Sequence, residues 1–95
     1  MILSFRHRGL ERYFRNPRYT DKRGIDGRMA RRLIYVLDAL DVIEHPGEMD
    51  LAGLYFHPLK GNRKGWYSVR VTGNWRIIWR MRGNDVVDVD LEDYH

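Results

Sequence analysis

The chain has 95 residues, a formal net charge of +4 and no cysteine. This length predicts a single domain over residues 1–95 with one modest core. The absence of cysteine excludes disulfides and thiolate metal sites, and no stretch approaches the ~20 apolar residues of a membrane helix. Because the apolar start, Met1–Phe5, is too short for a signal peptide and basic residues follow at once, we expect a cytoplasmic protein.

The first elements in chain order are a short strand and a short helix. Met1–Phe5 has the composition of a strand. Residues 7–15 carry apolar side chains at helical spacing, and Asn16-Pro17 ends that pattern. A polar, basic connection follows over residues 16–23.

A longer amphipathic helix follows. Asp21 or Asp26 can cap its start, and His45-Pro46-Gly47 closes the region. Its apolar residues recur at steps of three and four, which predicts a helix packed on a sheet: Ile25, Met29, Leu33, Val36, Leu37 and Leu40.

After residue 51 the period changes to two, which predicts strands. We expect a short strand over Leu54–His57 and two hairpins with turns at 72–74 and 83–84. In the last strand Val87, Val89 and Leu91 are expected to share one face. The element order predicts an α+β domain: a small twisted antiparallel sheet, two N-terminal helices packed on one face, and arginines on the other.

The second half of the chain contains a block that is both basic and aromatic. Residues 53–84 hold seven Lys or Arg, three Trp and two Tyr, and no Asp or Glu. Such a block is suited to binding a phosphate backbone with splayed bases. A solvated surface without function is the alternative interpretation.

Residues able to cleave RNA without a metal occur in the same half. The 2′-OH can attack the adjacent phosphate if one group removes its proton, another protonates the leaving 5′-oxygen, and fixed cations stabilise the phosphorane-like charge. The candidate proton carriers are His57, Tyr94 and His95, and the candidate phosphate contacts are Lys60, Arg63, Arg70 and Arg76.

Each of these residues also has an interpretation without catalysis. His57 can merely close a strand, residues 60–65 can be an ordinary exposed loop, and residues 93–95 can be a frayed end or the start of a purification tag. A zinc site formed by His57, Asp93 and His95 is disfavoured because no H-x-x-H spacing is present and the surroundings are cationic.

Three groups of residues resemble the HigB branch of the RelE-like toxins. They are the run His57-Pro58-Leu59-Lys60-Gly61 continuing to Val71, the run Asn74-Trp75-Arg76-Ile77, and the terminal Glu92-Asp93-Tyr94-His95. The opening residues 1–10 match more loosely. The resemblance implies a RelE-like fold and a ribosome-dependent endoribonuclease that cleaves mRNA in the ribosomal A site.

The resemblance also implies the roles of individual residues. His57, Lys60, Asp93, Tyr94 and His95 would form the catalytic group. Arg70 and Arg76 would bind the scissile phosphate, and Arg63 would contact RNA. No cofactor or metal is expected.

The partners implied are the ribosome, mRNA and a HigA-type antitoxin with a helix-turn-helix domain. Operator DNA would be contacted only indirectly, through that antitoxin. The free toxin is expected to be monomeric. Two alternatives stay open. The first is a non-catalytic module that only binds RNA or ribosomes, or that acts only as a co-repressor with an antitoxin. The second is a stand-alone metal nuclease.

Overall fold

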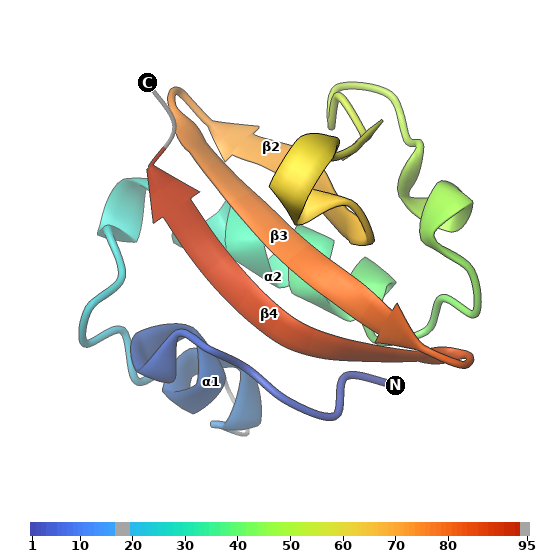
Figure 1. Ribbon diagram of the computed structural model, residues 1–95. Helices are drawn as coiled ribbons and strands as arrows, with labels where there is room; N and C mark the ends of the chain where they lie inside the picture. The colour runs from blue at the N-terminus through green and yellow to red at the C-terminus, as the bar shows by residue number, and fades with distance from the viewer. Residues whose placement is uncertain (17–19, 94–95) are drawn as a thin grey trace.

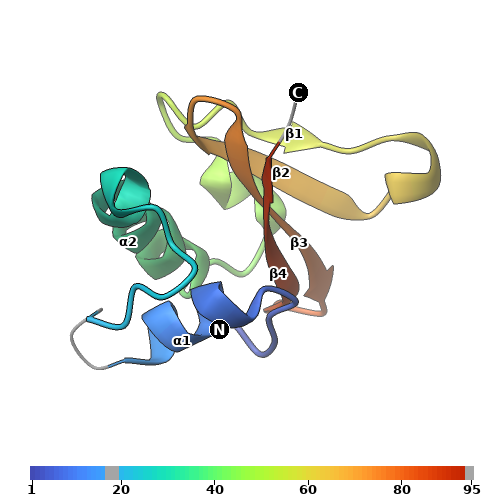
Figure 2. The same cartoon turned by 90° about the vertical axis from the view of Figure 1, so that its left-hand side faces the viewer.

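The computed structural model describes residues 1–16 and 20–93. Two helices precede an antiparallel sheet with the strand order β1-β2-β3-β4. In Figure 1 helix α2 runs behind the sheet, and Figure 2 shows both helices on the same side of it. The elements are α1 (Arg8–Arg15), α2 (Ala30–Leu40), β1 (His57–Pro58), β2 (Trp66–Thr72), β3 (Trp75–Arg82), β4 (Asp85–Asp93), and three short 3-10 turns, η1 (Gly27–Met29), η2 (Pro46–Met49) and η3 (Gly61–Arg63).

This architecture confirms the predicted α+β fold. Every residue of the apolar stripe predicted for the second helix is buried in the core between the helices and the sheet. From the sheet, Val69, Ile77 and Trp79 meet that stripe and are fully buried. The core therefore fixes one face of the sheet and leaves the other available. No helix in the described part of the chain is both long and apolar enough to cross a bilayer.

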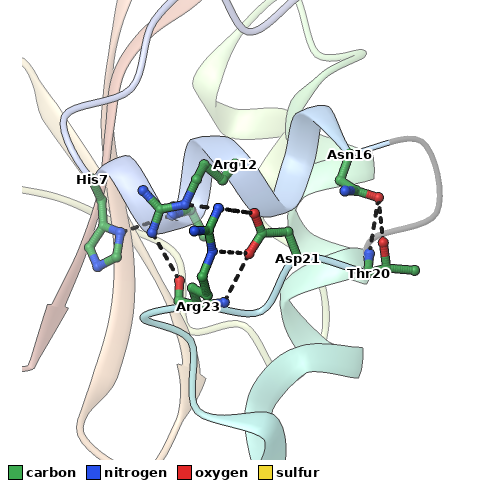
Figure 3. A network of polar contacts seen from close by, with 7 residues as sticks. His7, Arg12, Asn16, Thr20, Asp21 and Arg23 are labelled. Atoms are coloured by element: carbon green, nitrogen blue, oxygen red, sulfur yellow. Dashed lines mark hydrogen bonds and ion pairs between the residues drawn. The ribbon is translucent and has the colours of Figure 1, made fainter.

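Polar contacts tie the start of α1 to the segment that follows it (Figure 3). His7 caps the helix by accepting a hydrogen bond from the Leu10 N–H at 2.9 Å. Arg12 donates to the carbonyl of Arg23, and Arg23 in turn donates to both carboxylate oxygens of Asp21, at 3.0 and 2.8 Å. These hydrogen bonds from Arg23 lower the pKa of Asp21 to about 2.

Helix α2 begins through the turn η1. The Asp26 side chain accepts the Arg28 N–H at 2.9 Å and so caps η1, which runs directly into α2. Of the two predicted caps, Asp26 is confirmed, whereas Asp21 is engaged with Arg23.

Both predicted hairpins are present. The register pairs Thr72 with Trp75 and Arg82 with Asp85, so each turn has two residues. The first residue of each turn is a glycine with positive φ, 53° at Gly73 and 60° at Gly83. This is the geometry of type II′ turns, whose twist matches that of the flanking strands.

The predicted N-terminal strand is present only as two isolated parallel bridges beside β4, Ile2 with Val86 and Phe5 with Val89. The interruption lies at Asp88, which has φ of +56° and sits at a bulge in β4. Its N–H bonds to the Ser4 hydroxyl at 2.9 Å instead of to backbone. The bulge thus disrupts backbone pairing locally between the two bridges.

The same bulge corrects the predicted faces of β4. Val86, not Val87, joins Val89 and Leu91 in the core cluster. Val87 pairs with Arg80 on the opposite face. The predicted strand Leu54–His57 is also wrong in extent, because Tyr55 has φ of +50° and extended pairing begins only at His57.

Candidate active site on the open face of the sheet

The open face is the side of the sheet turned away from α2. One row of directly paired residues crosses it from His57 through Ser68 and Ile78 to Asp90. The next row pairs Arg70 with Arg76, and Arg76 with Glu92. The strands therefore place three of the predicted site residues, His57, Arg70 and Arg76, on neighbouring rows.

A cleft of about 350 Å³ lies on this face. That volume falls within the usual range for sites of small ligands. Among the described residues that line it are two arginines and a histidine but no carboxylate, so it suits an anion. The lining residues are Tyr55, His57, Ser68, Arg70, Gly73, Asn74, Trp75 and Arg76.

The two arginines of the cleft are direct cross-strand neighbours. Like charges at such positions destabilise a sheet unless other contacts offset the repulsion. Arg70 donates to the Gly73 carbonyl at 3.1 Å, and its guanidinium lies 5.3 Å from the centre of the Tyr55 ring. Arg76 is held by Glu92 on the adjacent strand. Two cations kept side by side in this way have an arrangement that suits a phosphate.

Glu92 connects this pair to the loop around η3. It accepts hydrogen bonds from Arg76 Nε and Nη2 at 3.0 and 2.7 Å, and from Arg63 Nη1 and Nη2 at 3.2 and 2.7 Å. Burial by itself raises the pKa of Glu92, but the hydrogen bonds from Arg63 and Arg76 outweigh it, so the pKa lies below its ordinary value. Glu92 is thus a carboxylate at neutral pH.

His57 is exposed at the rim of the cleft. Its Nδ1 lies 2.7 Å from the Phe56 carbonyl oxygen. In the tautomer that donates from Nδ1 to this carbonyl, Nε2 is the ring nitrogen left to accept a proton. The structure therefore favours Nε2 as the atom of His57 that can act on a ligand.

Lys60 lies outside this cleft. It precedes η3 and lines a separate cavity of about 450 Å³, together with Pro58, Lys64 and Tyr67 among others. Neither Lys60 nor Lys64 forms an ion pair with any residue of the described ranges. Arg63, from the same loop, is directed toward Glu92 instead.

Asp93 pairs with Trp75 at the end of β4 and lines a third cavity of about 380 Å³. This cavity shares Gly73, Asn74 and Trp75 with the cleft. Asp93 is therefore adjacent to the cleft without lining it. The predicted residues Tyr94 and His95 lie outside the described residues.

Within residues 1–16 and 20–93, no group of three or more His, Asp or Glu side chains is arranged to hold a metal ion. Two acidic residues of β4 are paired with arginines, Asp88 with Arg80 and Glu92 with Arg63 and Arg76, whereas Asp90 accepts the Leu91 N–H at 2.9 Å.

A model of the family described as "RelE-like toxin of type II toxin-antitoxin system HigB" matches residues 3–95. The chain belongs to this family. The toxin of a type II system acts opposite an antitoxin, so an antitoxin is its expected class of partner. The family resemblance inferred from the sequence motifs is confirmed.

Individual relatives agree with this family. The chain is 35% identical over 95 residues to "Endoribonuclease HigB" of Proteus vulgaris, covering both proteins completely. It is 31% identical over 83 residues to "Toxin HigB-1" of Vibrio cholerae, covering 84% of this chain and 83% of that one.

A solved structure has a similar fold. The YoeB-YefM toxin–antitoxin complex of Staphylococcus aureus contains a chain with a TM-score of 0.62 and 21% identity, covering 100% of this chain and 95% of that chain. At this identity the likeness concerns the fold alone, and it confirms the predicted RelE-like architecture.

The sequence reasoning assigned no role to Glu92. It noted this residue only as a neighbour of Asp93-Tyr94-His95. Regular pairing counted from the Gly83-Asn84 turn places Leu91 opposite Arg76, and only the register shift at the bulge brings Glu92 there. The contact with Arg63 had no signal in the sequence either, since it depends on where the loop folds.

Proposed function

We propose that this protein is an endoribonuclease toxin that cleaves mRNA in the ribosomal A site and thereby inhibits translation. The observation that carries the proposal is the cleft in which His57, Arg70 and Arg76 share one lining. Family membership and the 35% identity to a protein named Endoribonuclease HigB support RNA as the substrate. Dependence on the ribosome follows from the motif resemblance.

The proposed reaction is a transesterification. The 2′-oxygen loses its proton to a base and bonds to the adjacent phosphorus, while the bond to the 5′-oxygen breaks and an acid protonates that oxygen. The products are a 2′,3′-cyclic phosphate and a 5′-hydroxyl. His57, Tyr94 and His95 are proposed for proton transfer, with Asp93 beside them in the catalytic group.

The cations are proposed to stabilise the charge that develops on the phosphate. Arg70 and Arg76 lie side by side in the cleft, and this arrangement supports contact with the scissile phosphate. Lys60 lines a separate cavity, so its contribution requires that RNA extend beyond the cleft to the loop around η3. Arg63 is proposed to contact RNA at the edge of the cleft.

The proposed partners are the translating ribosome, mRNA and a HigA-type helix-turn-helix antitoxin, through which operator DNA is contacted indirectly. The N-terminal arginines, among them Arg6 and Arg8, are exposed and suited to contacts with RNA phosphates. A protein with these partners acts in the cytoplasm. Without its antitoxin it is proposed to be a monomer.

The experiment is primer extension on an mRNA translated in vitro, with the protein added and with ribosomes present or absent. We expect cleavage within codons only when ribosomes translate, and no cleavage of naked RNA with or without EDTA. Cleavage of naked RNA that EDTA abolishes would instead indicate a metal nuclease. Ribosome binding without cleavage would identify a non-catalytic module.

The same assay tests individual residues. Lys60→Ala should reduce cleavage by about 100-fold or more, because it removes a cation proposed to stabilise the transition state. Lys64→Ala is the matched control, since it removes the same charge from the same exposed loop and should leave cleavage unchanged. Equal activity of Lys60→Ala and Lys64→Ala, with both proteins folded, would remove Lys60 from the mechanism.

A further inference from the structure

Glu92 holds together two arginines that come from different elements. Arg76 is on β3, directly opposite Glu92, whereas Arg63 is in the loop around η3. All of the contacts are charge-assisted, and the shortest from each arginine is 2.7 Å. The side chains are also shielded: Arg76 is 16% exposed and Glu92 is 29% exposed. Partial burial makes these contacts stronger than those of an ordinary surface pair.

A cluster of arginines without Glu92 would be poorly ordered. The Arg63 side chain has no other hydrogen bond or ion pair within the described residues, so its guanidinium is held only by Glu92. Arg70 and Arg76 are neighbouring like charges on the sheet. Removal of the carboxylate would free Arg63 and increase the repulsion around Arg76. Transition-state stabilisation requires cations already held in place.

We propose that Glu92 is a positioning residue for the cleavage reaction. It orients Arg63 and Arg76 toward a phosphate in the cleft and joins the η3 loop to the sheet. This inference rests on the proposed function. A guanidinium has more N–H donors than a carboxylate engages, so Arg63 can contact Glu92 and RNA together.

The variant Glu92→Gln distinguishes a positioning role from a general structural role, because it should change RNA affinity and cleavage rate in opposite directions. Glu92→Gln removes a negative charge beside the cleft, so RNA binding should become tighter. The arginines lose their fixed orientation, so cleavage should become slower. A residue that serves only to keep the protein folded would weaken both.

The test measures RNA binding and cleavage separately for Glu92→Gln. We expect a single-stranded RNA oligonucleotide to bind more tightly, with the slope of log K against log salt steeper by about 0.7 for each arginine released. The single-turnover rate of mRNA cleavage on translating ribosomes, at saturating protein, should fall by roughly 10- to 100-fold.

A third measurement does not depend on activity. The Nε–H group of Arg76 donates a hydrogen bond to Glu92. In NMR spectra of wild-type protein labelled with ¹⁵N-arginine, its signal should therefore show protection from exchange with water. That protection should be lost in Glu92→Gln. If the wild-type protein cleaves no RNA, the proposed function fails. The exchange protection of Arg76 Nε–H and the RNA affinity then still decide whether Glu92 orders the arginines.

Two further variants complete the design. Asp88→Asn removes the same charge from the same strand and releases Arg80, and asparagine tolerates the positive φ at this position. It should leave the cleavage rate unchanged. Glu92→Asp keeps the charge but shortens the side chain, so RNA affinity should match the wild type while cleavage is reduced.

Several results would overturn the inference. Faster cleavage by Glu92→Gln would show that Glu92 competes with the phosphate instead of positioning its ligands. Unchanged cleavage, or unchanged protection of Arg76 Nε–H, would show that the arginines are ordered without Glu92. Glu92→Gln could instead lose both RNA binding and cleavage together with a lower Tm, and Glu92→Asp could lose them equally. That result would show that Glu92 has only a structural role.

Discussion

The two faces of strand β3 are stabilised in different ways. Toward the helices, Ile77 and Trp79 are fully buried, and Trp79 packs against Phe56 and Tyr67 with ring centres 6.2 and 5.9 Å apart. Toward the open face, Arg76 and Arg80 are held by carboxylates of β4. Apolar packing supplies most of the free energy of folding, so the helix side supports an open face built largely from charges.

The difference between the two faces of β3 explains why a binding site can form on this sheet. Hydrogen-bonded ion pairs fix the direction of a charged group but contribute little stability. Arginines can therefore be arranged for a ligand on one face without weakening the core on the other. The two faces should respond differently to mutation: the helix side in stability and the open face in activity.

The largest expected effect is that of Trp79→Ala. Removal of this fully buried side chain should lower the free energy of unfolding by about 3–5 kcal/mol, measured by urea denaturation. Trp79→Phe is the control. It keeps an aromatic ring and removes an indole N–H that has no partner within residues 1–16 and 20–93, so it should cost less. A loss below about 1 kcal/mol in Trp79→Ala would contradict the account of the helix side.

A smaller effect on stability, with a large one on activity, is expected on the open face. Arg80→Ala breaks a pair in which Arg80 is 51% exposed, so the unfolding free energy should change by less than about 1 kcal/mol and cleavage should be retained. Arg76→Ala should reduce cleavage by about 100-fold or more. Similar activities for the two variants would remove the distinction between the two arginines of β3.

The smallest expected effect is the dependence of stability on pH through Asp21, outside both faces. Its pKa is about 2 in the folded protein, below the ordinary value, so the unfolded state binds more protons between these values. The contribution of Asp21 is present above pH ~4 and is lost as pH falls toward ~2. Urea midpoints should thus fall less steeply over this range in Asp21→Asn, and identical slopes would contradict the prediction.

Local patterns predicted much of the fold. The stripe from Ile25 to Leu40 specified the second helix and its buried side, and the glycines at 73 and 83 specified the two hairpins. Each of these signals is carried by residues close together in the chain. The family was also recognisable from short motifs, whereas the roles of the individual site residues stay predictions.

The tertiary structure decided the remaining features because they depend on contacts between distant segments. Asp88 keeps a positive φ beside Ser4 and Arg80, and this bulge turns Val87 away from the core cluster against the simple alternation, although Val87 stays buried. Residues 1–5 contact β4 on both sides of the bulge. A period of two cannot report such a change of register.

The sequence by itself determined which side chains are available for the site. The tertiary structure decided which of them lie together. His57, Arg70 and Arg76 share one cleft because β1, β2 and β3 are adjacent, whereas Lys60 lines a separate cavity. Glu92 became part of the site because the η3 loop brings Arg63 to it. Charges that attract across dozens of residues leave no local pattern, so only the folded chain shows which of them meet.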